Sequence, residues 1–187
     1  MNIVIDLLPW EQIFLGSSLG LLITSLVSGI TLLRRRALGP VRWFFLTLFA
    51  VGAILPWLAQ PRFGARLRRS NQTNIAATSD DSEWPELRPR RYDRSAAEVM
   101  QAAVRALDHL SWKLASQEQL ALAAEVPIAN TPFIDDFRVT LAEENSQTVV
   151  NVHSSSRVGK GDMGANRRHV IQFFIVLEQQ LQSSTQR

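Results

Sequence analysis

The side chains of this sequence that could do chemistry gather in two short segments of its second half. One segment holds the adjacent carboxylates Asp135 and Asp136, and the other holds an imidazole, two hydroxyls and a guanidinium close together. The members of the second segment are His153, Ser154, Ser156 and Arg157. If neighbouring strands brought the two segments together, they would form a small polar site for an acidic ligand, a metal ion or acid–base chemistry.

Alternation along the first segment favours a structural role for these groups. Asp135 shares one face of the predicted strand with Phe133 and Phe137, so it points toward the core while Asp136 points to solvent. A carboxylate in a core must be protonated, paired or hydrogen-bonded, and the two hydroxyls on the next strand could donate to it. We therefore interpret the set mainly as hydrogen bonds that fix strand register.

Two alternatives stay open at this point. A bulge would slip the register and turn Asp136 inward, and Arg157 would then pair with one of the two carboxylates. A functional site would make this a small-ligand-binding or hydrolytic domain that uses Asp135, Asp136 and the segment from Ser154 to Arg157. Catalysis by paired carboxylates also needs a cleft and separated pKa values, which the sequence does not show.

Other chemistry fits the sequence poorly. The chain has no cysteine, which excludes thiolate nucleophiles and disulfides, and its three histidines lack the spacing of metal ligands. Ser154 and His153 are adjacent in a predicted strand, so they project from opposite faces and cannot act together as nucleophile and base. We expect no catalytic residue, no metal and no cofactor.

A glycine-rich segment follows the polar one. Gly159, Gly161 and Gly164 surround Lys160 just before a predicted helix, which is where anions often bind. The spacing does not match phosphate-binding loops, and Asp162 would compete for the same backbone amides. We favour a sharp turn into a helix that Asp162 caps.

Periodicity predicts the elements that position these residues. Ser95 and Glu98 form a capping-box pattern, which predicts a helix from Ser95 to just after Leu110. Alternation from Trp112 onward then predicts four strands, and a final apolar stripe, which ends at Leu181, predicts a second helix. The fold class is α+β: helix, four-stranded antiparallel sheet, helix, over residues 92–183.

Two apolar runs precede this domain, at 13–33 and 43–59, and neither contains a charged side chain. Each is long enough for a helix that crosses a bilayer, so residues 1–62 are predicted to form a transmembrane hairpin, joined by a polar linker at 63–91. Small residues recur every four positions along the first helix and should pack against another helix: Gly16, Gly20, Thr24 and Ser28.

Arginines flank the apolar runs, with four between them at positions 34, 35, 36 and 42. Contact with lipid headgroups explains this placement better than nucleic-acid binding does. A short loop with four arginines resists translocation, which places the loop in the cytoplasm or stroma. We expect an integral protein of a bacterial inner or thylakoid-type membrane, with the soluble domain in the periplasm or lumen.

Several of these motifs resemble one family. The runs from Phe133 to Val139 and from Val152 to Asn166, the approach from Trp84 to Leu87, Tyr92 and Trp112 are similar to the family called domain of unknown function 1499. The resemblance covers about 84–181, and its most specific part is the pattern from Ser154 to Asn166. It implies a bacterial or plastid-type protein, often membrane-attached or exported, and implies no catalytic residues.

The poverty of catalytic groups and the packing stripe together favour a non-enzymatic function. We expect an accessory or assembly protein, anchored by two helices, whose partners are membrane lipids and a larger membrane-protein complex. A lipid-headgroup sensor that uses the juxtamembrane arginines is a third hypothesis.

Overall fold

The structure is a computed structural model that describes residues 8–33, 39–60, 62–129 and 131–185 of the 187-residue chain. It divides into two compact units, Met1–Ser70 and Asn71–Arg187, which are considered separately. The arginines at positions 34–36, which are predicted to lie in the loop between the two apolar helices, are outside the described residues.

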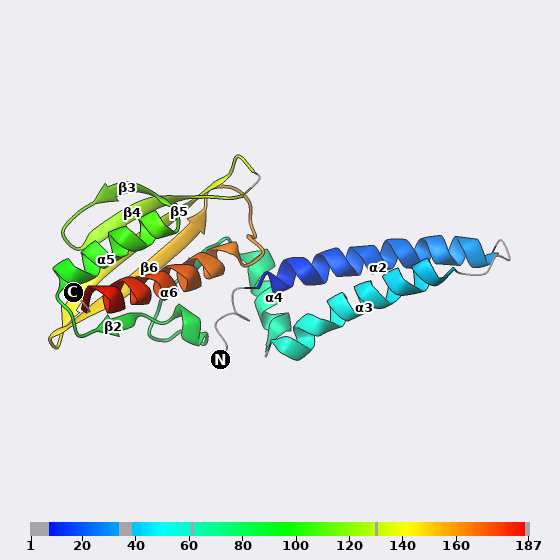
Figure 1. Cartoon of the computed structure of the whole chain (residues 1–187), viewed down its shortest axis with the longest axis horizontal. Helices are drawn as coiled ribbons and strands as arrows, with labels where there is room; N and C mark the ends of the chain where they lie inside the picture. Colours follow the sequence, from blue (N-terminus) through cyan, green and yellow to red (C-terminus); the bar gives the residue numbers. More distant parts are fainter. Residues whose placement is uncertain (1–7, 34–38, 61, 130, 186–187) are drawn as a thin grey trace. The chain divides into compact units, whose positions relative to one another are not determined.

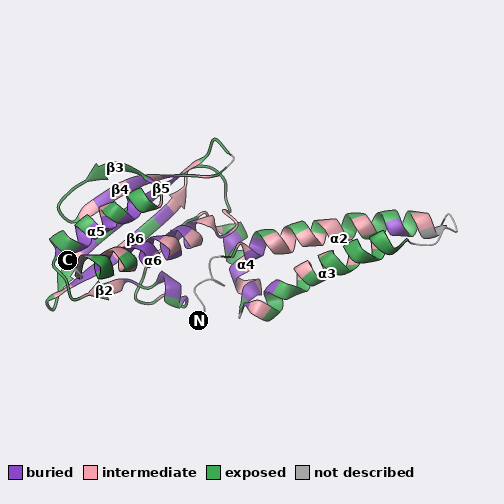
Figure 2. Ribbon diagram, viewed as in Figure 1, coloured by how far each residue is buried: buried purple, intermediate pink, exposed green. Residues whose placement is uncertain are grey.

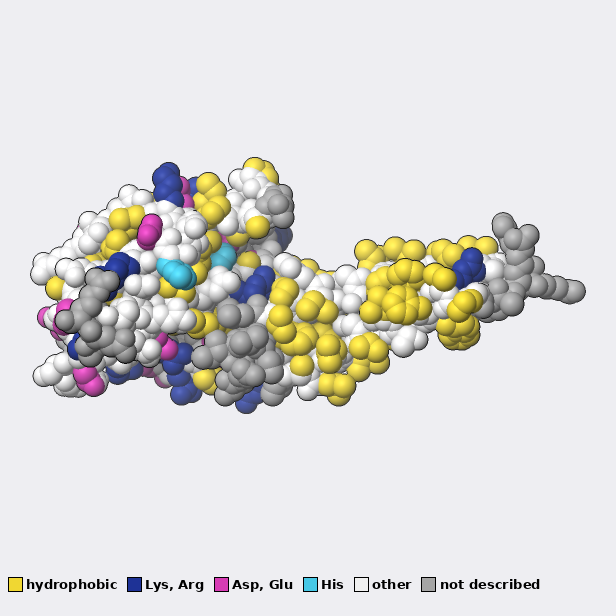
Figure 3. Space-filling view, viewed as in Figure 1, with side chains coloured by type: hydrophobic (Ala, Val, Ile, Leu, Met, Phe, Trp, Pro, Cys, Tyr) yellow, Lys and Arg dark blue, Asp and Glu magenta, His cyan; other side chains and the backbone are white. Residues whose placement is uncertain are grey.

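The first unit contains the two apolar helices that the sequence predicts, α2 (Trp10–Leu33) and α3 (Pro40–Ala59), followed by α4 (Phe63–Gln72). The segments Trp10–Thr31 and Pro40–Ala59 are long and apolar enough to cross a membrane, and only 6% of each window is buried. Most of their described residues are exposed or half-buried (Figure 2), and hydrophobic side chains cover much of the surface seen in Figure 3. Pro40 starts α3 because the first helical position needs no backbone N–H.

The two apolar helices approach closely at small residues. A Cβ atom on Gly20 of α2 would lie 2.6 Å from the ring of Phe49, and one on Gly52 of α3 would collide with Ser17. These positions therefore fit only glycine at the present distance between the helices. Near the other ends of the helices, an Arg42 N–H donates to Thr31 Oγ1.

The remaining members of the predicted stripe differ in their surroundings. Thr24 Oγ1 donates to the carbonyl of Gly20 at 2.8 Å, and Ser28 is buried. A Cβ on Gly16 would meet nothing within 4 Å. The close approach within the hairpin therefore involves Gly20 but not Gly16.

The second unit is built on an antiparallel sheet. Its strands are β1 (Ile75–Ala77), β2 (Arg90–Tyr92), β3 (Lys113–Gln117), β4 (Ala121–Pro127), β5 (Ile134–Glu144) and β6 (Gln147–Ser156). The order is β1-β6-β5-β4-β3, and β2 also pairs with β6. The helices α5 (Ala96–His109) and α6 (Ala165–Thr185) lie side by side against the sheet (Figure 1), and a short 3-10 helix, η1 (Pro85–Leu87), precedes β2.

The sheet has six strands rather than the predicted four. Of the two additional strands, β1 lies in the segment predicted as a linker, and β2 spans the end of that segment at residue 91. Both pair with the outer edge of β6. Each is three residues long, which is too short to show an alternation of two. The α+β class, the antiparallel pairing and the order of the other elements are as predicted.

Capping side chains begin the helices α5 and α6 where the sequence predicts. The capping box of α5 is formed, because Ser95 Oγ accepts from the amide of Glu98 while the Glu98 carboxylate accepts from the amide of Ser95 at 3.0 Å. Asp162 caps α6 by accepting from the amides of Gly164 and Asn166 at 2.8 and 2.9 Å. The core lies between the helices and the sheet, around buried side chains such as Val99, Leu107, Phe137, Val139 and Phe173.

The packing of the first unit yields a prediction. Gly20→Val should separate α2 from α3, because the added side chain collides with Phe49, whereas Gly16→Val should have little effect. Overpacking of this kind costs about 1–3 kcal/mol. Thermal unfolding of the full chain in mild detergent should show a lower midpoint for G20V only, and equal midpoints for the two variants would contradict the helix contact.

Candidate functional site

The predicted polar residues form two clusters on opposite faces of the sheet. β5 and β6 pair in register, with Asp135 opposite Ser156, Asp136 opposite Ser155 and Phe137 opposite Ser154. No bulge interrupts this ladder, so Asp135 and Ser154 face the helices while Asp136 and Ser155 face away. We call the two groups the inner-face network and the outer-face cluster.

Asn166 of α6 is the centre of the inner-face network. Its Nδ2 lies 2.7 Å from Asp162 Oδ2, 2.8 Å from the carbonyl oxygen of Asn74 and 2.9 Å from Ser156 Oγ. Its Oδ1 accepts from Ser154 Oγ at 2.6 Å. One amide thus joins the strand β6, the start of α6 and the segment that enters β1, and Ser154 and Asn166 are completely buried.

Asp135 and His169 complete this network. His169 Nδ1 lies 3.3 Å from Ser154 Oγ and 3.7 Å from Asp135 Oδ2. Since the Ser154 hydroxyl donates to Asn166, we assign the Nδ1 tautomer, in which the ring donates to Ser154. The ring also packs edge-on against Trp112, at 5.5 Å between centroids.

Burial determines how these two groups titrate. It lowers the pKa of His169 to about 4, with a further decrease from the positive charge of Arg168 and a smaller opposing effect from Asp162. Burial also raises the pKa of the Asp135 carboxyl, although a hydrogen bond from Ser156 opposes that shift. His169 is therefore neutral near pH 7, and the two groups do not form a strong ion pair.

The outer-face cluster is an ion-pair array on the exposed side of the sheet. Arg157 Nη2 lies 2.6 Å from Asp136 and 2.8 Å from Glu125, and Lys113 lies 3.2 Å from the other oxygen of Glu125. These hydrogen bonds lower the pKa of Glu125 and raise the pKa of Arg157. Exposed pairs contribute little stability individually, so this array mainly fixes the positions of the charges.

A cavity of about 300 Å³ lies on this face, and its lining includes Ala115, Ala123 and Ser155. Its rim includes Arg138 and His153, which are cross-strand neighbours and exposed. Two such groups side by side could hold an anion. Among the described residues, those that line the cavity belong to β3–β6, apart from Arg157, which directly follows β6.

The structure thus separates residues that the sequence grouped. Asp135, Ser154, Ser156 and Asp162 belong to the inner-face network, whereas Asp136 and Arg157 belong to the outer-face cluster. The alternative of a bulge that turns Asp136 inward is wrong, although Arg157 does pair with that carboxylate. Gly159 and Gly164 have φ angles of 95° and 75°, which agrees with the predicted sharp turn.

Sequence reasoning missed several members of the inner-face network. Asn166 and His169 occupy the buried side of α6, and Asn74 lies in the segment interpreted as a linker. A buried ion pair was missed too, between Arg167 of α6 and Glu86 of η1 at 3.0 Å. Asn166 had a detectable signal, because it lies four residues before Val170 on the predicted apolar stripe.

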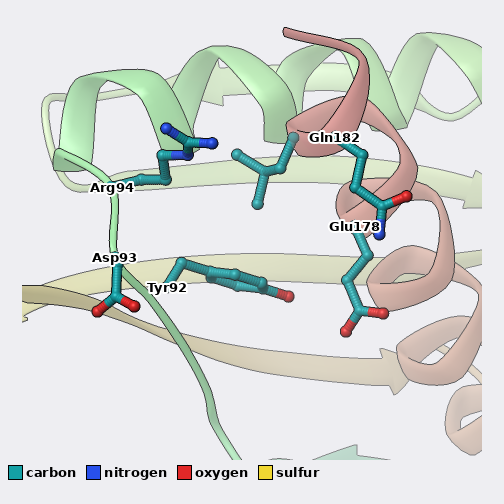
Figure 4. Close-up of a pocket in the computed structure, with 6 residues that line it drawn as sticks. Tyr92, Asp93, Arg94, Glu178 and Gln182 are labelled. Carbon is teal, nitrogen blue, oxygen red and sulfur yellow. The ribbon is translucent and has the colours of Figure 1, made fainter. Parts of the chain in front are cut away.

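A second cavity, of about 430 Å³, lies near the end of α6 and is lined by Tyr92, Asp93, Arg94, Glu178, Leu181 and Gln182. The Tyr92 hydroxyl points toward the carboxylate of Glu178 (Figure 4). Burial and this negative charge raise the pKa of Tyr92, while Arg90 opposes the shift. Tyr92 therefore remains a neutral phenol near pH 7.

Among the described residues, no group of three or more His, Cys, Asp or Glu side chains could hold a metal ion.

The features above define a small α+β domain, with two helices packed against an antiparallel sheet, that follows a pair of apolar helices. Residues 66–177 match the family described as protein of unknown function, DUF1499. The chain belongs to this family, which confirms the resemblance seen in its motifs. None of the curated proteins matches the chain.

Solved structures include distant matches. The crystal structure of CalU16 from Micromonospora echinospora is 11% identical, with a TM-score of 0.36, over 58% of this chain and 93% of that chain. The crystal structure of TTHA0849 from Thermus thermophilus is 10% identical, with a TM-score of 0.37, over 59% of this chain and 98% of that chain.

Substitutions of two adjacent serines test the division of the polar residues into an inner-face network and an outer-face cluster. Ser154→Ala should destabilise the second unit by about 1–3 kcal/mol, because Asn166 Oδ1 and His169 lose a buried partner. Ser155→Ala, on the outer face, should change stability by less than about 0.5 kcal/mol. Thermal unfolding of the full chain, followed by near-UV circular dichroism, measures both, and similar losses would contradict the assignment of faces.

His169 makes stability depend on pH. Its ordinary pKa is 6.5, so below that value the unfolded chain binds a proton that the folded domain does not take up until about pH 4. The free energy of unfolding should therefore fall as the pH decreases from about 6.5 to about 4, by up to about 3 kcal/mol. Asp135 has the opposite effect, because its raised pKa favours the folded state on acidification.

The variant His169→Gln isolates the contribution of His169 to the pH dependence of the free energy of unfolding, since Asp135 is present in both proteins. The difference between the unfolding midpoints measured at about pH 7 and about pH 5 should be smaller in H169Q than in the original chain. Equal differences would show that His169 does not titrate in this way.

Proposed function

We propose that this protein is a membrane-anchored, non-enzymatic accessory or assembly protein that contacts a larger membrane complex. The observation that carries the proposal is the burial of the inner-face network. Most of its hydroxyl, amide and carboxylate groups bind one another, although Asp135 Oδ2 accepts no hydrogen bond among the described residues. Ser154 and Asn166 have no exposed surface with which to reach a substrate. This arrangement supports a structural role for the most specific motif of the chain.

The surface of the apolar helices supports the anchoring. Leu22 and Leu26 of α2 are 67% and 65% exposed, and Leu58 of α3 is 78% exposed. A continuous apolar surface of this length is stable in lipid or against another membrane protein. We further propose that the loop between α2 and α3, with its arginines, lies in the cytoplasm or stroma, which leaves the second unit in the periplasm or lumen of a bacterial inner or thylakoid-type membrane.

The alternative function, ligand binding or hydrolysis, would need the outer-face cavity. Both of its carboxylates, Asp136 and Glu125, are already held by Arg157, and the pKa of Glu125 is lowered as a result. A general base should instead have a pKa near the working pH. Within the described part of the second unit, the lining consists of strand residues and Arg157, whereas ligand sites usually enclose most of the ligand. These observations favour the accessory function.

Purification from native membranes tests the proposal. The full chain, extracted in a mild detergent, should migrate on a native gel with partner proteins in fixed ratio, which mass spectrometry identifies. A photoreactive residue at the exposed Leu22 position should crosslink to a partner, while one at the buried Ser28 position should not. Migration as a lone monomer in every mild detergent, with crosslinks to lipid alone, would overturn the accessory function.

A further inference from the structure

The outer face of the sheet carries one cation that its ion pairs leave free. Arg138 is exposed, and among the described residues its side chain has no hydrogen bond or ion pair. Arg157, in contrast, is held by Asp136 and Glu125. Lys113 is held by the second of these carboxylates. Three cations therefore accompany two carboxylates here, and the excess positive charge belongs to Arg138.

Strand register places His153 beside this cation. Arg138 and His153 are cross-strand partners in the β5–β6 ladder, and both line the outer-face cavity. The Cβ atoms of such a pair lie about 5 Å apart, so one small group can contact both side chains. His153 is exposed too, and its imidazole has no side-chain partner in the described part of the chain. The pair can therefore direct its N–H donors at one point.

Small residues on both sides leave the space around this pair open. Ala123 is the neighbour of Arg138 on β4, and Ala77 is the neighbour of His153 on β1. Ser155, the next residue of β6 on this face, is also small and lines the cavity. Side chains of this size cannot fill the room beside an arginine or a histidine, which explains the cavity of about 300 Å³.

A carboxylate fits the chemistry of the pair. A guanidinium has several N–H donors and no acceptor, and it can bind a carboxylate through two parallel hydrogen bonds. A neutral imidazole adds one further N–H donor. Asp136 and Glu125 line the same cavity, so they would repel a polymer with a negative charge on every unit, such as a nucleic acid. A single carboxylate with uncharged neighbours avoids most of this repulsion.

The shape of the cavity favours a segment of another protein over a free small molecule. Among the described residues, strands and Arg157 supply the whole lining, so a bound group is contacted from the sheet side. Free ligands are usually enclosed over most of their surface, whereas a protein segment adds contacts on the surrounding face. Thr140 and Asn151 offer such contacts, because they form the next cross-strand pair on this side of the sheet.

We infer that the outer-face cavity is a docking point for the partner protein, where Arg138 and His153 bind one carboxylate side chain of a partner segment that has few other charges. This inference rests on the accessory function proposed above, for which it names the chemistry of the contact. The ion pairs of the outer-face cluster occupy Asp136 and Glu125, which keeps the Arg138 guanidinium available.

An NMR titration of the full chain tests the carboxylate site. The isotope-labelled chain in an uncharged detergent is titrated with the capped peptide Gly-Glu-Gly, and with Gly-Gln-Gly as the uncharged control. Only the Glu peptide should shift the amide signals of residues 138 and 153 to saturation. Arg138→Gln should weaken this binding several-fold. Arg105→Gln is the matched control, because Arg105 is exposed on α5 and its loss changes the net charge equally.

Two outcomes of the titration would contradict the inference. Equal binding of the Glu peptide to R138Q and R105Q would show that the site lies elsewhere. Inorganic phosphate is the second probe, and saturation of the same signals by less phosphate than peptide would overturn the choice of a protein carboxylate.

Co-purification from native membranes separates this inference from the accessory function. R138Q should retain several-fold less partner protein than R105Q. Equal retention by the two variants would overturn the docking point and leave the accessory function intact. Migration of the original chain as a lone monomer in every mild detergent would instead overturn the accessory function on which the inference rests.

Discussion

The side-chain amide of Asn166 is the contact on which the arrangement of the second unit depends. Its two N–H hydrogens are shared among three acceptors, one each from Asn74, Ser156 and Asp162, and its carbonyl accepts from Ser154. These partners belong to the entry segment, to β6 and to the start of α6. An apolar residue at this position would leave several buried groups unpaired at once, which is the expensive case for hydrogen bonds in proteins.

Strand alternation decides what the neighbouring polar residues can do. Residues 153 to 157 alternate between the two faces of the sheet, so a run that looks like one constellation in the sequence becomes two separate environments. On the inner face, burial keeps His169 neutral and favours protonation of Asp135. On the outer face, ion pairs keep Glu125 and Arg157 charged. Side chains that are adjacent in the sequence thus differ more in burial and charge than side chains that are far apart in the sequence but lie on the same face of the sheet.

The sequence predicted those parts of the fold that have a long repeat or a strong local signal. The apolar helices, the capping box at Ser95 and the alternation around Phe137 each rest on several residues that agree. β1 and β2 could not be predicted in this way, because three residues on an edge carry no repeat and their pairing depends on β6. Alternation along its strand made the inward position of Asp135 predictable. Its spatial neighbour His169 lies thirty-four residues later, so no local repeat links the two residues.

The inner-face network also fixes the point at which the chain enters the domain. A Cβ on Gly161 would lie 2.8 Å from the backbone of Asn71, and Asn74 is bonded to β6 and to the loop after it, so the entry segment is held tightly. The position of β1 therefore depends on the loop after β6 as well as on the three residues that pair with β6.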